Sequence, residues 1–337
     1  MGFRARGKRW LRTSLIETGA LRAASALATP GAAILMYHSV MDNPEQHGAS
    51  FGSIIHSTCV FARQMEMIAR HYHPVALDDL VKILEGCRPV PRRAVVVTFD
   101  DGYVDNCEIA APVLNRLGIP AAFYVVVDSI AGGRPPWPIR VRHAFLSTRV
   151  AIWTDPAARR WPLGKHDERL HAFEAACTHC GRLAGEAQEN AVVAIEKQLD
   201  SAPYAPNQRL MMSWEQLRGL RKQGHVVGSH SLSHPNLAYL AKGEAEQELL
   251  TSKQKLEQQL CEPVWHFSYP NPVLDPHWTD ETAVLSGRVG YRTAVTTRRG
   301  LARPKCNPLE LPRILPTKQV DGLRWNLECA FAGYTRS

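Results

Sequence analysis

The chain has 337 residues, of which 45% are hydrophobic and 21% are charged. This length and composition are typical of a globular protein with one large domain or two small ones, and they exclude a disordered chain. No run approaches the roughly 18 consecutive apolar residues of a membrane-spanning helix. The net charge is +8, but no nucleic-acid-binding motif accompanies it, so we expect no nucleic-acid partner.

The first 30 residues carry most of this charge excess. Six arginines and lysines stand there against Glu17 alone, which leaves +5 of the total of +8. A basic, partly amphipathic helix of this kind can lie on an anionic membrane surface, and we expect residues 1–28 to make such a contact. A frayed helix, or one docked on the core, explains the same residues equally well. Because no compact apolar stretch follows the cations, a secretory signal is not indicated. We therefore expect a cytoplasmic protein that is peripheral at the inner membrane face if this segment binds there.

Eight cysteines are spread along the chain. Cys177 and Cys180 form a single CxxC pair, whereas a zinc ribbon needs two such pairs. In a large domain without a secretory signal, we interpret these cysteines as reduced structural thiols.

The hydrophobic pattern predicts alternating strands and helices in the first part of the chain. In chain order they are a strand at 34–37, helices at 61–71 and 77–84, a strand at 94–99, a helix at 108–117 and a strand at 121–127. Strand–helix–strand units at this spacing predict a mainly parallel sheet.

The regular pattern lapses between about residues 129 and 210. A loop at 132–138 is followed by helical patches at about 167–176 and 186–199. We expect a helical insertion that either covers the mouth of the active site or decorates the surface. Its tryptophans could stack on the rings of a ligand, but a small core of the insertion is the favoured interpretation; they are Trp137, Trp153 and Trp161.

The alternating pattern resumes after the insertion. The elements predicted there are helices at 214–223 and 243–260 and strands at 265–268, 293–297 and 311–315.

The most informative stretch is the apolar run Val95–Phe99, which ends in Asp100, Asp101 and Gly102. It predicts a buried strand whose C-terminal turn carries the two carboxylates, at the edge where α/β proteins place their sites. Two ionised carboxylates would repel each other in a dry site, and a bound cation resolves the repulsion with one ligand and one base. A solvated Asp-Gly turn is the alternative.

A second polar cluster contains His230 and His234, four residues apart. If the segment is helical, both imidazoles lie on one face and can bind the same metal ion. Together with Asp101 they would form a set of one carboxylate and two imidazoles. Such a set leaves coordination positions open, as catalytic zinc sites require.

These two clusters resemble the first two motifs of the polysaccharide deacetylases of the NodB-homology group, carbohydrate esterase family 4. The segment Phe267–Pro270 resembles the third motif of that family. Ile34–Val40 and Leu311–Ile314 resemble its exopolysaccharide-type branch, in which the motif order is permuted. The similarity covers roughly residues 31–128 and 210–320.

The resemblance implies an α/β fold, namely a deformed (β/α) barrel with a helical insertion. Residues 31–337 would form a single domain behind the basic segment 1–30. It also implies a divalent cation, expected to be zinc, at the C-terminal ends of the strands. The roles carried over from the family are metal ligation by Asp101, His230 and His234, general base for Asp100, and oxyanion or substrate contacts for Tyr269, Pro270 and Asn271.

The general acid implied by the permuted branch is His38, which follows Tyr37 at the end of the first strand. Most of the family has its acid histidine late in the chain, and no such motif follows Arg313 here. We expect Asp100 to lie close enough to keep the imidazole of His38 protonated near neutral pH. A core histidine at a strand end is the alternative.

Two positions depart from the family pattern. The third motif usually carries an arginine that braces the base, and Ser268 stands in its place. We expect Arg313 to reach back and supply that charge, with a structural salt bridge as the alternative. The same motif usually ends in Tyr-Gly, whereas Asn271 and Pro272 follow here, which alters the predicted wall of the substrate groove.

The sequence therefore predicts a zinc-dependent de-N-acetylase that acts on N-acetylhexosamine units of a glycan or glycolipid. Hydrolysis of another sugar amide, such as an N-formyl group, is the alternative among enzymes. A catalytically silent glycan-binding protein of a polysaccharide assembly system is the alternative from another class. The presence of both carboxylates and all three histidines favours an enzyme, and the missing motif arginine favours a silent protein.

Overall fold

The computed structural model describes residues 15, 18, 20–28, 30–42, 54–132, 134–201, 210–270 and 275–334. Most of the basic N-terminal segment lies outside the described residues, and so does Asn271. The described part of that segment includes the helix α2 (Ala20–Leu27), which packs against the last helix of the chain, α13 (Val320–Phe331).

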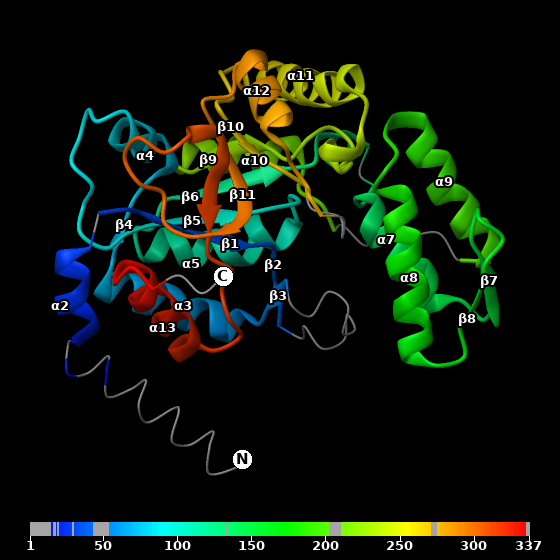
Figure 1. Ribbon diagram of the computed structural model, residues 1–337, viewed down its shortest axis with the longest axis horizontal. Coiled ribbons are helices and arrows are strands. Elements are labelled where there is room, and N and C mark those ends of the chain that lie inside the picture. The colour runs from blue at the N-terminus through cyan, green and yellow to red at the C-terminus, as the bar shows by residue number, and fades with distance from the viewer. Residues whose placement is uncertain are drawn as a thin grey trace, which may run out of the picture.

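Eight parallel strands form the central sheet, which curls into a nearly closed barrel (Figure 1). They are β1 (Ala33–Tyr37), β4 (His73–Pro74), β5 (Ala94–Phe99), β6 (Ala121–Val125), β9 (Val226–Ser229), β10 (His266–Ser268), β11 (Thr293–Arg299) and β12 (Leu311–Arg313). The strand order is β1-β5-β6-β9-β10-β11-β12, with β4 also paired to β5. Parallel backbone contacts between Leu35 and Ile314 join the first strand to the end of the last one, so the predicted deformed barrel is confirmed.

Helices on the outside of the barrel connect these strands. They are α3 (Thr58–His71), α4 (Leu77–Leu84), α5 (Ala111–Arg116), α6 (Val127–Gly132), α10 (Trp214–Lys222), α11 (Lys242–Leu260) and α12 (Asp280–Val289), with short 3₁₀ turns η3 (Leu237–Tyr239) and η4 (Pro308–Glu310). The predictions for α4 and β5 match the observed bounds, and α10 and α11 differ from theirs by one residue. A short parallel pair, β2 (Ser39–Val40) and β3 (Ile55–His56), was not predicted.

The helix predicted at 108–117 begins instead as a π-helix, η2 (Asn106–Ala110), that continues into α5. The amide of Ala111 donates to the carbonyl of Asn106, five residues back. Pro112 follows, and a proline has no amide hydrogen to donate and crowds the carbonyl four residues before it. A widened turn ahead of the proline relieves this conflict, and such turns are frequent at functional sites.

Residues 134–201 form a helical lobe beside the barrel (Figure 1). It contains α7 (Trp137–Ser147), the antiparallel hairpin of β7 (Ile152–Thr154) and β8 (Arg160–Pro162), α8 (His166–Cys180) and α9 (Gly185–Gln198). The lobe has its own hydrophobic cluster, which includes Trp137 and Trp153, with Trp161 packed against it. Trp137 and Trp153 are therefore core residues of the lobe, as the sequence favoured, and Trp161 is partly buried beside them. Cys177 and Cys180 are free thiols buried in the same cluster.

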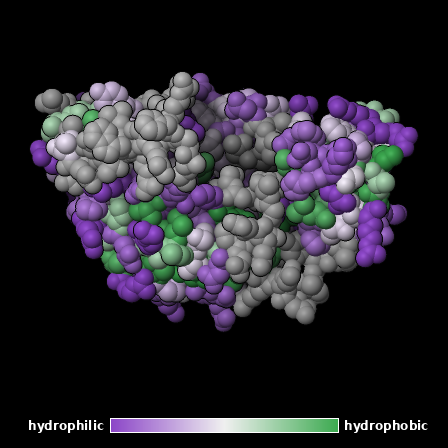
Figure 2. Space-filling view, turned by 90° about the horizontal axis from the view of Figure 1, so that it is seen from below, coloured by the Kyte–Doolittle hydropathy of each residue, from purple (hydrophilic) through white to green (hydrophobic). Residues whose placement is uncertain are grey.

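Hydrophilic side chains predominate on the described part of the face shown in Figure 2, and hydrophobic ones occupy smaller areas between them. Exposed large hydrophobic side chains include Leu146, Ile152 and Val193 of the lobe. No helix in the described part of the chain combines the length and apolar character that crossing a bilayer requires.

The alternation of side chains along the strands determines what faces the inside of the barrel. Interior apolar residues such as Ile34, Val96, Val226 and Leu311 form one cluster, and their strand neighbours pack outward against the helices. Residues an even number of positions further along the same strands face the same way. From those four apolar residues, this rule leads to His38, Asp100, His230 and Arg313, respectively. The period of the strand therefore brings the predicted polar residues to the C-terminal mouth of the barrel.

Gly228 tests how tightly this interior is packed, because a Cβ there would lie 2.5 Å from Cδ1 of Tyr124 and 2.9 Å from the carbonyl oxygen of His266. We expect Gly228→Ala to lower the free energy of unfolding by about 1–3 kcal/mol, measured by urea denaturation. Gly219→Ala is the control, since no atom lies within 4 Å of its Cβ in α10, and it should be neutral or stabilising. Equal stabilities for the two variants would contradict the packing described.

Candidate active site

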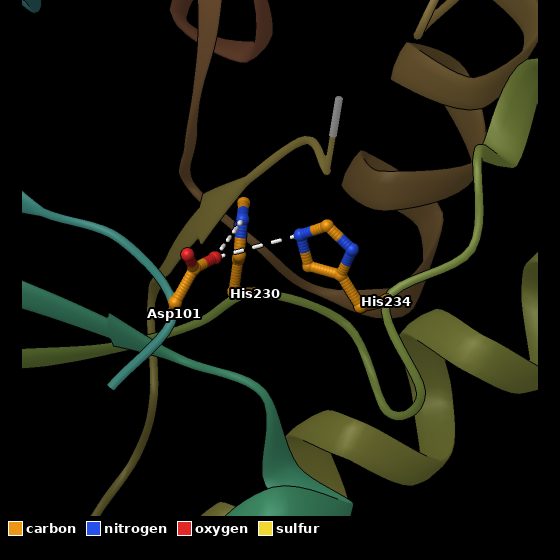
Figure 3. Close-up of side chains that lie close together, drawn as sticks. All are labelled: Asp101, His230 and His234. Carbon is orange, nitrogen blue, oxygen red and sulfur yellow. Dashed lines mark ion pairs between the residues drawn. The ribbon is translucent and has the colours of Figure 1, made fainter. Parts of the chain in front are cut away.

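The three predicted metal ligands lie together at the mouth of the barrel (Figure 3). Oδ1 of Asp101 is 3.4 Å from Nε2 of His230 and 3.4 Å from Nε2 of His234. All three side chains are buried, and their ligand atoms lie within 4.8 Å of one another. One carboxylate and two imidazole nitrogens that converge in this way fit the donor set of a catalytic zinc site.

The electrostatics of this cluster favour an ionised carboxylate. Burial alone would raise the pKa of Asp101, but hydrogen bonds from His230 and His234 outweigh it and hold that pKa well below its usual range. Burial lowers the pKa of His234 from its ordinary value. Burial would lower the pKa of His230, but the charge of Asp100 and the hydrogen bond to Asp101 outweigh it and raise that pKa. A metal ion binds the carboxylate and the neutral imidazole, so its binding would displace any proton on His230.

The segment that contains the two histidines is a loop, so the helical face considered from the sequence is wrong. Ser231 and His234 have φ angles of 67° and 65°, which break a right-handed helix, and Pro235 disfavours helical geometry in the residue before it. The loop is held by the buried carboxylate of Glu248 on α11. Glu248 accepts hydrogen bonds from the amides of Leu232 and Ser233 (3.0 Å each) and from the Ser233 hydroxyl (2.6 Å).

Asp100 is paired with Arg313, as expected from the missing motif arginine. The guanidinium donates to both carboxylate oxygens at 2.8 Å, and both side chains are almost fully buried. Nε of Arg313 donates to the carbonyl of Thr296 at 2.8 Å, which fixes the plane of the guanidinium. Burial would raise the pKa of Asp100, but the charges of Arg313 and His230 outweigh it and the pKa is lowered.

His38 lies at the end of β1, and its environment differs from the one expected. Burial lowers the pKa of His38 from its ordinary value, and this effect exceeds the opposing influence of Asp101 and Asp100. The carboxylate oxygens of Asp100 are engaged by Arg313 instead. This lowered pKa runs against the expectation that a nearby Asp100 keeps the imidazole protonated.

Two residues that the sequence analysis did not select hold the segment containing His38. The carboxylate of Asp105 accepts hydrogen bonds from the Ser39 hydroxyl (2.6 Å), the Val40 amide (3.1 Å) and Nδ2 of Asn106 (2.8 Å). Nδ2 of Asn106 also donates to the carbonyl of His38 at 2.6 Å. The signal available in the sequence was a polar pair one turn after the Asp-Asp-Gly turn, but a solvated helix start explains such a pair as well.

A further histidine near the site was also missed. His277 is buried, and its Nε2 accepts a hydrogen bond from the amide of Thr297 at 3.3 Å. Burial lowers its pKa to about 4, and the charges of Arg313 and His230 contribute. In the sequence it stands outside every motif, so nothing marked it.

The predicted substrate residues are placed unevenly. The Tyr269 hydroxyl donates to the carbonyl of Leu309 at 3.0 Å, and its ring is buried in the cluster between the sheet and the outer helices. This position gives the Tyr269 side chain packing contacts, and the substrate contact of Tyr269 stays a prediction. Pro270 is buried where the chain leaves β10. The third predicted contact, Asn271, lies outside the described residues.

The model of the polysaccharide deacetylase family matches residues 88–143 and 183–294. This chain belongs to the polysaccharide deacetylase family. It is therefore a hydrolase that acts on amide bonds of acetylated sugars. Residues 144–182, between the two matched ranges, belong to the lobe.

Relatives with known sequence or structure resemble most of this polysaccharide deacetylase. The Bacillus subtilis protein named "Putative polysaccharide deacetylase YxkH" is 21% identical over 305 residues, which cover 90% of this chain and 76% of that protein. The Streptococcus pyogenes deacetylase PplD matches with a TM-score of 0.59 at 18% identity and covers 88% of this chain and 98% of its own. IcaB from Ammonifex degensii matches with a TM-score of 0.57 at 20% identity, over 89% and 97% of the two chains. These structures share the fold described above.

Asp105 provides a test of the hydrogen bonds around His38. Burial raises its pKa to about 6, so the folded state holds this proton more tightly than the unfolded state. Its contribution to stability is complete below its ordinary pKa and is lost as the pH rises through about 6. Because asparagine does not ionise, Asp105→Asn should gain stability relative to the parent protein between pH 4 and 7, by an amount on the order of 1–3 kcal/mol. Urea unfolding at several pH values measures this, and parallel pH profiles would contradict it.

Proposed function

We propose that this polysaccharide deacetylase is a metal-dependent de-N-acetylase of N-acetylhexosamine units in a glycan or glycolipid. The observation that supports it most is the buried cluster of Asp101, His230 and His234 beside the Asp100–Arg313 ion pair. A structural ion-pair network has no need of two imidazole nitrogens aimed at one carboxylate oxygen. A metal-dependent hydrolytic site needs ligands for a cation and a general base, and the donor types of these residues suit both roles.

The proposed metal ligands are Asp101, His230 and His234, and the proposed ion is zinc. When bound, such an ion polarises the acetyl carbonyl and makes a water molecule more acidic. Three protein ligands would leave coordination positions open for water and substrate. Nδ1 of His230 lies 2.8 Å from the carbonyl of Ser268, which turns Nε2 toward Asp101.

Asp100 is the proposed general base, which takes a proton from the attacking water. Arg313 is the proposed positioning residue, because its two hydrogen bonds hold the carboxylate in one orientation and in its ionised form. In this proposal Arg313 carries the charge that the third motif lacks at Ser268. A bidentate bond leaves further lone pairs of the carboxylate for the water, since each oxygen can accept more than one hydrogen bond.

His38 is the proposed general acid, which returns a proton to the amine leaving group. An amine leaves readily only once its nitrogen is protonated. We infer that the protonated imidazole of His38 passes its proton to the amine nitrogen, and that the proton which Asp100 takes from water then restores the proton on His38. The backbone amide of Asn271, next to Pro270, is proposed to stabilise the negative charge on the acetyl oxygen.

We propose that residues 31–337 act as one catalytic domain in which about 129–210 is an insertion. We further propose that the protein is cytoplasmic and that residues 1–28 bring it to the inner membrane face. The net charge of +5 in residues 1–30 supports the contact, since anionic lipids attract basic segments. A membrane position would suit a substrate carried on a lipid.

The function is tested by separating the two neighbouring carboxylates. Asp100→Asn should keep its metal and lose about 10²–10⁴-fold in turnover, because an amide accepts no proton from water. Asp101→Asn should lose both metal and turnover. Metal content by atomic absorption and acetate release from a panel of N-acetylated sugars measure these effects, and formate release from N-formyl sugars tests the alternative substrate.

A purified protein that carries no stoichiometric metal, and gains no activity with zinc, cobalt or nickel, would contradict the proposed function. Metal binding without release of acetate or formate would instead favour a silent glycan-binding protein. An Asp100→Asn variant near the parent rate would place the base elsewhere.

The acid is tested by His38→Ala, which should lower turnover by about 10²–10⁴-fold with metal content intact. The alkaline limb of the pH–rate profile should flatten in this variant. Activity should recover in part on substrates whose leaving amine is less basic, because they need the proton less. His73→Ala, an exposed histidine on β4, is the control and should behave like the parent. An unchanged alkaline limb in His38→Ala would reject the assignment.

A further inference from the structure

The two histidines of the candidate metal site are held by different parts of the molecule. The backbone amide of His230 donates to the carbonyl of Val125 on β6 at 2.9 Å, and its Nδ1 contacts the carbonyl of Ser268 on β10 at 2.8 Å. Both partners belong to the barrel. The orientation of the His230 ring is therefore determined by the strands on either side of it.

The His234 side chain lacks such a support. Its Nδ1 is buried and has no hydrogen-bond partner among the described residues. Metal-binding histidines commonly donate their second ring nitrogen to a fixed acceptor, which orients the ring. The backbone of His234 is also in the left-handed region, with φ of 65°. Such a conformation persists only where the surroundings hold it. The position of this imidazole therefore depends on contacts to its main chain.

The amide of His234 donates to the Ser231 hydroxyl at 3.0 Å within the loop, and its carbonyl is held by the helical lobe. Nε1 of Trp137, the first residue of α7, donates to the carbonyl of His234 at 2.8 Å. Trp137 is 4% exposed, and its ring belongs to the core of the lobe. An indole packed in this way has little freedom to move. The carbonyl of His234 is thus tied to a rigid part of the lobe.

A second contact joins the lobe to the same loop. The backbone amide of Asn236 donates to the carbonyl of Gly181 at 3.1 Å, where α8 ends. Gly181 lies within residues 144–182, which the family model does not match. The support for the second half of the histidine loop therefore comes in part from a segment outside the matched family core.

We propose that the helical lobe is part of the metal site and that Trp137 is a positioning residue for the ligand His234. This inference rests on the proposed role of His234 in metal binding. Nδ1 of His234 makes no hydrogen bond among the described residues that would orient the ring. The contacts from the lobe to the main chain of the loop orient it instead. On this account the insertion is neither a decoration nor a simple cover over the site.

Trp137→Phe tests the proposal, because it keeps an aromatic ring in the core of the lobe and removes the indole N–H. We expect zinc affinity to fall by about tenfold or more, as for other residues that orient metal ligands. Competition with a chromophoric chelator on the full-length protein measures that affinity directly. Activity lost by the variant should return as the zinc concentration is raised.

Trp161→Phe is the matched control. The indole of Trp161 also donates a hydrogen bond within the lobe, to Oδ2 of Asp155 at 3.0 Å, and it packs against the same cluster. This variant should bind zinc like the parent. If Trp137→Phe fails to fold, benzothienylalanine at position 137 keeps the shape of tryptophan without the N–H and takes its place.

The outcomes separate this inference from the proposed function. One outcome is that the parent protein binds zinc and a variant without the N–H donor at position 137 binds it with the same affinity. That result would overturn this inference and leave the proposed function standing. Equal losses in Trp137→Phe and Trp161→Phe would also overturn it, since they would reflect general loosening of the lobe. A parent protein that binds no zinc would overturn the proposed function instead.

Discussion

The rest of the site depends on one buried ion pair, that between Asp100 and Arg313. An unpaired charge is too costly to bury, so each side chain can occupy the barrel interior only because the other is there. Asp100 directly follows β5 in the first half of the chain, and Arg313 is the final residue of β12, near the end of the chain. The pair therefore links the closure of the barrel to the geometry of its mouth.

Much of the fold and of this site could be predicted because both follow from the period of a strand. A β-branched run such as Val95–Val97 specifies a buried strand, and the side chains two and four residues further on must face the same way. Motif spacing then identified the residues that meet at the mouth. The contact between Arg313 and Asp100 could be anticipated because Ser268 stands where the family has an arginine. The carboxylate of Asp100 therefore needed another cation.

The remaining features depend on contacts that no local pattern encodes. The loop from Ser231 to His234 is shaped by Glu248, a residue on a distant helix that reads in the sequence as one more solvated charge. The lowered pKa of His38 results from its burial in the barrel, and the extent of that burial cannot be derived from the neighbouring residues in the sequence. The lobe packs around its own core and contacts the site through single hydrogen bonds. Such bonds produce no periodic pattern in the sequence.

The π-helix has a consequence for how this protein can change over time. A π turn is an α turn with one residue added. Deleting one residue of Asn106–Ala110 would leave a regular helix, yet it would rotate the preceding residues by about 100° about the axis. Asp105 and Asn106 would then turn away from the His38 segment while the hydrophobic core stayed almost intact. A deletion in this turn would therefore remove the hydrogen bonds to the His38 segment while the fold is kept. We expect relatives that use this segment to keep the number of residues in the turn constant.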